Sequence, residues 1–507
     1  MVEVLQIETP ALGDRSYLVH DGRSALVIDP QRDIGRVLGL AGEHGVRITH
    51  VAETHIHNDY LSGGLALARA TRARYLVNAA DPVGFDRTPV ADGDQVRIGD
   101  TLSLRVLATP GHTFSHLSYA LAADGHVTGV FTGGSLLYGA TGRPDLLGPE
   151  HTQALARAQY ASAQRLAREL PDSAEIYPTH GFGSFCSAGQ ATTNSSTMGH
   201  EKLANPALAL TERAYLDTLL AGLDSWPAYY AHMAPANLAG PDIADLSPPR
   251  RADAAEILRR IRAGEWVVDL RDRAAFAAGF VRGSASFPLE GSFTSYLGWT
   301  IPWGAPVTLL GATGEQVAQA QRELMRIGYD RLAAAATGRP GLWADGGALA
   351  SMRLASFADL AAANAGRAPV ASQVSDAATA AASDASKASD VSKASDVSKA
   401  SAASKASAAS KASAASKITG VSGLVVLDVR RRLEWADAHI AGAVHIPFSD
   451  LARRLGEIPP GELWVHCQSG YRAMVAASLV AAAGRQVTVI DDDFDNAAGV
   501  GLPLARG

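Results

Sequence analysis

Imidazole and carboxylate side chains recur near the start of the chain at a spacing typical of metal sites. In the stretch ETHIHNDYLSGG, His55, His57 and Asp59 follow directly after an apolar run. Two later motifs, TPGH and PTHG, add His112 and His180, each again after an apolar, strand-like run. Histidine is the commonest ligand for borderline metals, and several loops are needed to surround one ion. The pattern predicts a metal centre where the ends of several strands converge.

A single thiol offers a second kind of chemistry. Cys467 lies in WVHCQSGYRAM, between a predicted buried strand and the start of a helix. Unpaired backbone N–H groups and the positive end of the helix dipole meet in such a loop, so it lowers a thiol pKa and can hold an anion. Gly470 permits the turn, and Arg472 adds a fixed positive charge. The loop predicts a nucleophilic thiolate that can carry a persulfide.

Composition narrows the classes of function. The 507 residues are 47% hydrophobic and 19% charged, and the formal net charge is -6 without a basic block, which argues against nucleic-acid binding. The N-terminus lacks a basic region followed by an apolar one, and no apolar run reaches membrane-spanning length. Two cysteines far apart exclude a disulfide framework. We expect a cytoplasmic protein with no membrane partner.

The chain divides into four pieces. A double proline in LSPPRR separates 1–245 from 247–360, and a repetitive Ala/Ser/Lys tract at 366–418 precedes 419–507. The tract has almost no large apolar side chains to offset the entropy of ordering, so we expect a linker. On both sides of it, apolar runs alternate with helical patterns, which predicts parallel α/β sheets.

The second and fourth pieces look like copies of one another. EWVVDLRDRAAF in the earlier copy matches LVVLDVRRRLEW in the later one, and each continues through a glycine turn into a proline. In the aligned loop of the earlier copy, Gly311 stands in place of Cys467 and Gln316 in place of Arg472. Both the nucleophile and the cation are missing, so we expect an inactive scaffold, docking surface or dimer interface.

The last piece resembles the rhodanese family of sulfurtransferases. The resemblance rests on the Cys-x-x-x-x-Arg loop after a strand, on LDVR and on HIAGAVHIP, and it covers nearly all of 419–507. It implies that Cys467 carries the transferred sulfur and that Arg472 takes part in catalysis; the alternative is a buried structural cysteine. It also implies that the persulfide or anionic donor is bound by the rest of the loop: Gln468, Ser469, Gly470 and Tyr471.

Residues 1–240 resemble the metallo-β-lactamase superfamily in the motifs LVIDP, THIHND, TPGH, FTGGSLLYG, GRPD and PTHG. The resemblance implies an αββα sandwich with a metal at the sheet edge, and it is strongest to persulfide dioxygenases and the glyoxalase II hydrolases. The order of the pieces is similar to a bacterial fusion of persulfide dioxygenase and sulfurtransferase used in sulfide detoxification. The expected fold class is α/β multidomain, with this sandwich followed by two rhodanese-like domains with parallel sheets.

The resemblance also implies a set of ligands. Dinuclear zinc hydrolases of the superfamily have His-x-His-x-Asp-His, and Tyr60 replaces the last histidine here, which favours one metal over two. Family dioxygenases hold one Fe(II) by two histidines, matched by His55 and His112, and by a carboxylate. Gly134 stands at the carboxylate position. Three outcomes compete: a modified iron site, a relocated site with another metal such as zinc, or loss of the metal.

Neighbouring residues offer replacements for the missing ligand. His57, Asp59 and His180 are either alternative ligands or supports for the ligands. Cys186, in a glycine-rich loop after His180, is expected to accept a persulfide or adjoin the metal; the alternative is a small buried residue. Arg143 either holds the anionic substrate or forms an ion pair within the protein.

The leading hypothesis is a persulfide dioxygenase and sulfurtransferase. The first piece would oxidise a low-molecular-weight persulfide to sulfite at one Fe(II) per chain, and Cys467 would transfer sulfane sulfur, travelling on the linker. One alternative is a rhodanese-type sulfurtransferase whose metal domain has lost its catalytic activity. Another is a glyoxalase II-like metallohydrolase. The expected partners are small persulfides and thiosulfate. The sequence does not identify the low-molecular-weight thiol that carries the persulfide. The resemblance further implies a homo-oligomer.

Overall fold

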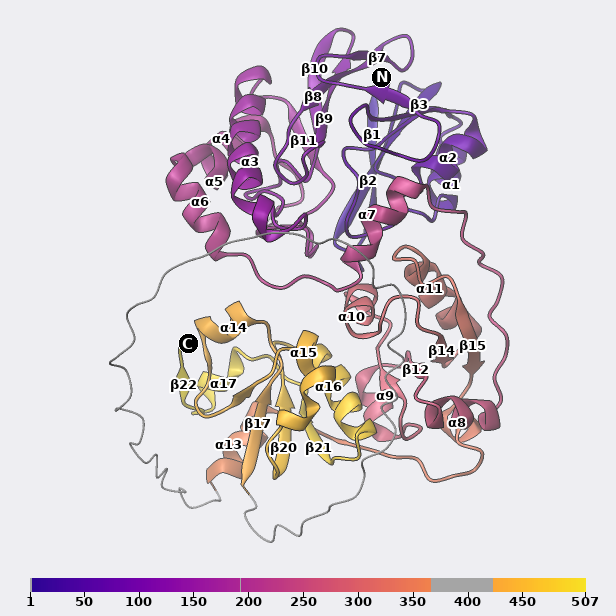
Figure 1. Cartoon of the computed structure of the whole chain (residues 1–507), viewed down its shortest axis with the longest axis vertical. Helices are drawn as coiled ribbons and strands as arrows, with labels where there is room; N and C mark the ends of the chain where they lie inside the picture. The colour runs from indigo at the N-terminus through magenta and orange to yellow at the C-terminus, as the bar shows by residue number, and fades with distance from the viewer. Residues whose placement is uncertain (1, 192, 366–422) are drawn as a thin grey trace, which may run out of the picture.

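Three domains in contact make up the computed structural model, which describes residues 2–191, 193–365 and 423–507 (Figure 1). The linker expected at 366–418 lies outside these ranges. Within them, no helix is both long enough and apolar enough to cross a bilayer.

The first domain contains all elements up to residue 239. Its strands are β1 (Glu3–Thr9), β2 (Asp14–His20), β3 (Ser24–Ile28), β4 (Arg47–Ala52), β5 (Arg74–Asn78), β6 (Thr88–Val90), β7 (Gln95–Arg97), β8 (Leu102–Ala108), β9 (Leu117–Ala123), β10 (His126–Gly133) and β11 (Glu175–Pro178). Its helices are α1 (Gly35–Glu43), α2 (Gly64–Thr71), α3 (Pro149–Glu169), α4 (Met198–Ala204), α5 (Pro206–Ala209), α6 (Glu212–Ala221) and α7 (Tyr230–Ala239).

Two sheets packed face to face form the centre of this domain. One has the order β1-β2-β3-β4-β5-β6 and the other β11-β10-β9-β8-β7. Inward-facing residues of both sheets, among them Tyr17, Leu104 and Phe131, share one buried core. The apolar stripes of α1 and α2 cover the outer face of the first sheet, and those of α3 and α6 cover the second. This is the expected αββα sandwich.

The other two domains follow in sequence. The middle domain contains α8 (Ala254–Arg262), β12 (Trp266–Asp269), α9 (Arg273–Ala278), β13 (Ala285–Ser286), α10 (Phe293–Thr300), β14 (Val307–Gly311), α11 (Gly314–Met325), β15 (Leu332–Thr337) and α12 (Pro340–Trp343). The C-terminal domain contains β16 (Arg353–Ala355), α13 (Phe357–Ala365), β17 (Leu424–Asp428), α14 (Arg432–Asp437), β18 (His439–Ile440), β19 (Val444–His445), α15 (Phe448–Arg454), a 3₁₀ turn (Leu455–Glu457), β20 (Glu462–His466), α16 (Tyr471–Ala482), β21 (Val487–Ile490), α17 (Asn496–Gly499) and β22 (Leu504–Ala505).

These two domains repeat one strand order. The middle sheet runs β13-β12-β14-β15, and the C-terminal sheet runs β19-β17-β20-β21 with β16 added at its edge. All of these neighbours pair in parallel. Arg271 pairs with Asp269 after β12, as Arg430 pairs with Asp428 after β17. The duplication expected from the sequence is therefore present in the architecture.

The domain boundary expected at 360 needs a correction. β16 pairs with β21, so this strand belongs to the C-terminal sheet. The buried side chains of Phe357 and Leu360 on α13 pack in one core with Trp464 and Ile490. Burial of this apolar surface attaches the residues from about 353 onward to the C-terminal domain. Residues 366–422 thus join two parts of one domain.

The C-terminal domain is docked on the middle domain. Buried residues of all three domains, including Tyr60, Phe293 and Met474, form one hydrophobic cluster. Between the middle and C-terminal domains, the Ser286 amide donates a hydrogen bond of 2.9 Å to the buried Ser478 hydroxyl. The expectation that Cys467 travels on a linker is therefore wrong for this arrangement, because its domain is held by buried contacts.

Candidate functional site

Loops after β4, β8 and β11 bring three histidines of the first domain together. His55, His112 and His180 each offer one ring nitrogen, these nitrogens lie within 4.8 Å of one another, and all three residues are buried. The Nε2 atoms of His55 and His180 are 3.4 Å apart. Two nitrogens bound ~2 Å from one tetrahedral ion stand about 3.3 Å apart. The spacing therefore fits two ligands of a single ion.

Hydrogen bonds on the outer side of two rings determine which nitrogen faces the centre. His112 Nδ1 donates to the Arg143 carbonyl at 2.8 Å, and within the described residues its buried Nε2 has no partner. His55 Nδ1 lies 2.9 Å from the Thr54 hydroxyl, whose own hydrogen goes to Asp29. His55 Nδ1 must therefore be the donor. Both Nε2 atoms present lone pairs inward, as in metal-binding histidines.

Two carboxylates hold the third imidazole. His180 Nδ1 lies 2.9 Å from Asp14 Oδ1 and 3.2 Å from Asp59 Oδ2. Burial disfavours the charged ring, but the two carboxylates raise the pKa of His180 to about 10. Burial and the charge of His180 lower the pKa of His112 to about 3. The Nε2 atoms of His55 and His180 are too close for their lone pairs to face each other without a cation between them. This cation is either a proton or a metal ion.

His57 turns its Nε2 away from this centre, and Tyr60 explains why. His57 Nε2 lies 3.0 Å from the Tyr60 hydroxyl and 3.3 Å from carboxylate oxygens of both Asp29 and Glu53. Because Tyr60 donates to the Asp29 carbonyl, it accepts from His57. Burial opposes protonation, but Asp29 and Glu53 raise the pKa of His57 to about 9. Tyr60 therefore stabilises a buried imidazolium.

Two further groups of ligand atoms overlap with the first. His57, Asp59 and His180 form one, and Asp29, Glu53 and His57 form the other, each buried and within 4.8 Å. Both include His57, whose Nε2 lies against Asp29 and Glu53 and whose buried Nδ1 has no hydrogen-bond partner among the described residues. Among the alternative ligands expected from the sequence, His180 is the one whose Nε2 faces His55.

Gly134 leaves no room for the carboxylate of the family pattern. A β-carbon built on it would stand 2.3 Å from Cδ2 of His112. The ring of His112 thus occupies the space in which a side chain at this position would begin. A carboxylate nearby in sequence, Asp145, is paired with Arg143 through both oxygens at 2.7 Å.

The structure favours the ion-pair alternative for Arg143. Besides Asp145, its guanidinium donates to the carbonyls of Phe185 and Asp224. The side chain is 4% exposed, so it is committed to protein groups rather than open to a substrate anion. These contacts hold in place the loop of Arg143, whose own carbonyl accepts the hydrogen bond from His112.

Cys186 lies near Asp14 and Asp59, the carboxylates that hold His180, and is not activated. It is fully buried, and burial together with the charges of Asp59 and Asp14 raises the pKa of its thiol well above the usual value. A protonated thiol is a poor nucleophile, which disfavours the role of persulfide acceptor. The alternative of a small buried residue fits this environment.

Cys467 lies where the sequence predicts, between β20 and α16. Its side chain is buried, and Gly470 at φ +88° turns the chain into the helix. A β-carbon at Gly470 would stand 2.0 Å from Asp491 and 2.6 Å from Arg273, so glycine is required. Arg273 of α9 also donates to the Ser469 carbonyl at 2.6 Å. The middle domain therefore supports the thiol loop directly.

Arg472 is held by a residue that the sequence did not single out. Its two terminal nitrogens donate to Glu434 of α14 at 2.6 and 2.7 Å. Burial works against ionisation of Glu434, but Arg472 lowers the pKa of that carboxyl to about 2. Arg431 Nε also donates to Glu434 at 3.2 Å. Two guanidinium groups share one carboxylate, which leaves one net positive charge beside the thiol loop.

All three domains meet beside this loop. The Tyr471 hydroxyl donates to the Pro288 carbonyl at 2.8 Å, and the ring of Tyr296 packs on Tyr471 with centroids 5.2 Å apart. Arg431 lies 5.6 Å over the ring of Phe185 from the first domain. A small cavity next to Arg472 is lined by Tyr296, Trp299, Arg431, Pro447, Phe448, Ser449 and Arg472. Gln468, by contrast, donates to the exposed Asp493 and Asp495.

Gln316 occupies the corresponding loop of the middle domain. Its Oε1 accepts from the Ala312 amide at 2.7 Å, and its Nε2 donates to the Leu270 carbonyl at 2.8 Å. A β-carbon at Gly311 would approach Val317 to 2.9 Å. This loop has no thiol and no guanidinium, and one of its amides is already bonded to Gln316. It is therefore a hydrogen-bonded turn and is not suited to bind an anion.

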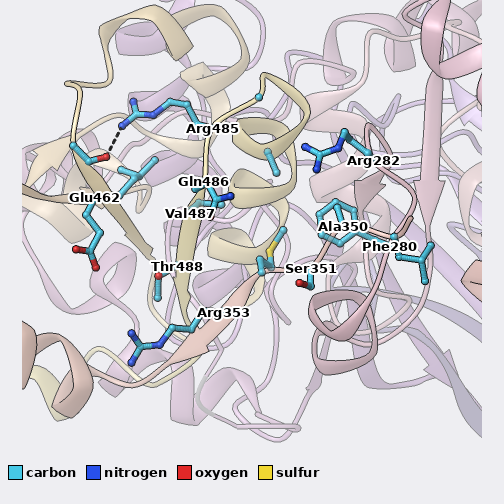
Figure 2. A pocket seen from close by; sticks show the side chains of 16 residues that line it. Phe280, Arg282, Ala350, Ser351, Arg353, Glu462, Arg485, Gln486, Val487 and Thr488 are labelled. Atoms are coloured by element: carbon cyan, nitrogen blue, oxygen red, sulfur yellow. Dashed lines mark hydrogen bonds between the residues drawn. The ribbon is translucent and has the colours of Figure 1, made fainter. Parts of the chain in front are cut away.

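Figure 2 shows a cavity of about 810 Å³ between the middle and C-terminal domains. Phe280 and Arg282 line one side, and Arg485 and Gln486 line the other, just before β21. Arg485 donates to backbone carbonyls at 458 and 459. Cys467 follows the carboxyl end of β20, so this cavity lies at the opposite end of the sheet from the thiol.

Sequence reasoning missed four residues that support the two sites: Asp14, His116, Arg273 and Glu434. Asp14, Arg273 and Glu434 act on partners far away in the chain, for example 166 residues between Asp14 and His180. Such pairs leave no local pattern. One signal was available, because His116 stands four residues after His112 in TPGHTFSH.

Comparison with known families gives a match in each of two regions of the chain. Residues 11–180 match the metallo-beta-lactamase superfamily, and residues 409–498 match the rhodanese-like domain. The first match contains the three histidines and the second contains Cys467.

Two known proteins and one solved structure illustrate the likeness. Hydroxyacylglutathione hydrolase of Nitrosococcus oceani is 34% identical over 158 residues, 31% of this chain and 57% of that protein. Persulfide dioxygenase ETHE1 of Homo sapiens is 30% identical over 205 residues, 40% of this chain and 72% of that protein. The chain thus spans little more than half the length of the hydrolase. A crystal structure of a metallo-beta-lactamase from Staphylococcus aureus subsp. aureus COL has a TM-score of 0.60 at 29% identity, covering 67% of this chain and 99% of that one.

Proposed function

Because the chain belongs to the metallo-β-lactamase superfamily and carries a C-terminal rhodanese domain, we propose a two-site sulfur enzyme. The first domain oxidises a thiol persulfide to sulfite at one Fe(II), and the C-terminal domain transfers sulfane sulfur through Cys467. The observation that supports the metal half is that His55, His112 and His180 each offer a buried ring nitrogen within 4.8 Å of the other two. In this proposal His55, His112 and His180 hold the ion, with His180 in place of the family carboxylate.

The donor set fits such an ion. Nitrogen ligands suit iron and zinc, and a bound Fe(II) would supply a redox centre with positions open to substrate and dioxygen. The protein's own residues prepare the site. Thr54 and the Arg143 carbonyl fix the tautomers of His55 and His112, and Asp14 holds the proton on His180 Nδ1. These contacts orient the ligands before the ion arrives.

The thiol loop is arranged for sulfur transfer. The Cys467 thiolate attacks the outer sulfur of thiosulfate or of a persulfide, the S–S bond of the donor breaks, and sulfite or a thiolate leaves with the electron pair. An acceptor nucleophile then takes the sulfur from the Cys467 persulfide and regenerates the thiolate. The net positive charge of Arg431 and Arg472 against Glu434 favours an anionic donor here.

Oxygen uptake with glutathione persulfide tests the first half of this proposal. The iron-loaded enzyme is expected to consume one O₂ per sulfite formed, and His112→Ala to stop both. A His151→Ala variant is the matched control, because that histidine is on the surface at the start of α3. Sulfite formation that persists in His112→Ala would contradict the proposal.

The expected homo-oligomer stays a prediction.

A metallohydrolase is the second candidate. Three histidines and an open position also describe catalytic zinc sites, and several relatives are hydroxyacylglutathione hydrolases. Hydrolysis of a glutathione thioester by the zinc-loaded protein, with no oxygen uptake by the iron-loaded one, would favour it. Tyr60 argues against the two-zinc form, because its hydroxyl stabilises His57 as an imidazolium.

A further inference from the structure

His116 is a fourth buried imidazole beside the three convergent ones. Its ring stacks on His55 with centroids 4.9 Å apart and an interplanar angle of 26°. Nε2 lies 3.0 Å from the Gly134 amide and accepts its hydrogen. Nδ1 lies 2.9 Å from the Thr109 hydroxyl. Since Nε2 is the acceptor, Nδ1 carries the ring hydrogen, so His116 does not offer a lone pair to the metal centre.

The chain passes between two imidazole rings at positions 133 and 134. A β-carbon at Gly133, which has φ +51°, would stand 2.6 Å from His116 Nε2. A β-carbon at Gly134 would stand 2.3 Å from the His112 ring on the other side. Only two successive glycines fit this passage, and the bond from Gly134 to His116 sets the orientation of the peptide.

Gly134 is also linked to a ligand through its own carbonyl, which belongs to the next peptide unit along the chain. The Gly134 carbonyl accepts from the Gly142 amide at 2.8 Å. The next residue, Arg143, offers the carbonyl that receives the His112 Nδ1 hydrogen at 2.8 Å. His116 is therefore the first member of a chain of three hydrogen bonds that ends on His112.

We propose that His116 is a positioning residue which, with Gly134, commits the site to imidazole ligands alone. The glycine removes the carboxylate and admits the ring of His112, and His116 holds the peptide that makes this possible. The inference rests on the proposed metal function and deepens it. Without a carboxylate ligand, a bound dication keeps its full charge toward an anionic sulfur substrate.

Two isosteric variants test this proposal in the full-length protein. His116→Gln places an amide oxygen close to the position of Nε2 and keeps the acceptor, whereas His116→Asn reaches only the position of Nδ1 and loses it. Cobalt(II) binding, followed by its visible absorption, is the probe. We expect the glutamine variant to bind cobalt like the wild type, and the asparagine variant ~10–100-fold more weakly with an altered spectrum. Equal affinity and an unchanged spectrum in His116→Asn would overturn the proposal.

Amide hydrogen exchange of the metal-free protein separates this inference from the metal function. The Gly134 amide is expected to be protected in the wild type and in His116→Gln, and to exchange at least ~10-fold faster in His116→Asn. If the wild type binds no cobalt, the proposed metal function fails, but faster exchange still supports the positioning role. Unchanged exchange in His116→Asn overturns it whatever the metal does.

Discussion

Replacing Glu434 by glutamine removes the one carboxylate that holds Arg431 and Arg472. Because Arg472 lowers the pKa of Glu434 from 4.5 to about 2, the ionised form contributes to folding. At ~1.4 kcal/mol per unit, the upper limit is about 3 kcal/mol at neutral pH. The side chain is 21% exposed, and allowing for screening by solvent reduces this to about 2 kcal/mol.

The sign of the pH dependence follows from the lowered pKa of Glu434. Its contribution is fully present above pH 4.5 and is lost as the pH falls toward 2, with less than half left at about pH 3. Hydrogen exchange of α14 measures it locally. We expect Glu434→Gln to exchange ~30-fold faster than the wild type at pH 7 and ~5-fold faster at pH 3. Equal rates at pH 7, or a ratio that does not shrink with acidity, would refute the reasoning.

Three further changes have expected outcomes. Cys467→Ser should reduce thiosulfate:cyanide transfer to background without changing metal content, and transfer that survives would rule out the thiol. Arg273→Ala should lower the kcat/KM of that reaction ~10-fold, because about 1.5 kcal/mol of support to the Ser469 carbonyl is lost, and kinetics that match the wild type would remove the middle domain from the site. Gly134→Asp should weaken cobalt binding, since its β-carbon meets the His112 ring, and a titration showing tighter binding would contradict this.

Local motifs were enough to place several candidate residues in loops after strands. His55, His112 and Cys467 each follow an apolar run, and a short strand ending in a loop can be read from neighbouring residues alone. The duplicated strand order was visible for the same reason, since each copy keeps the Asp-x-Arg ion pair after its first strand.

Long-range pairs account for what the sequence could not show. His180 was one of several alternative ligands, because its orientation depends on Asp14, which is 166 residues away. Residues 353–360 were placed in the wrong domain, because their partners lie beyond the repetitive tract. The Phe357 amide, for example, donates to Asp492, 135 residues further on. Alanine-rich helices have no local pattern that specifies which core they join.

Metal content of protein purified without oxygen tests the central claim most directly. We expect about one iron per chain in the wild type and in the surface control His151→Ala, and loss of it in both His112→Ala and His180→Ala. Loss in His180→Ala is the decisive result, because it would identify the third imidazole as the replacement for the absent carboxylate. Iron retained in His180→Ala, or a wild type that binds no metal while Cys467 still transfers sulfur, would contradict the three-histidine site.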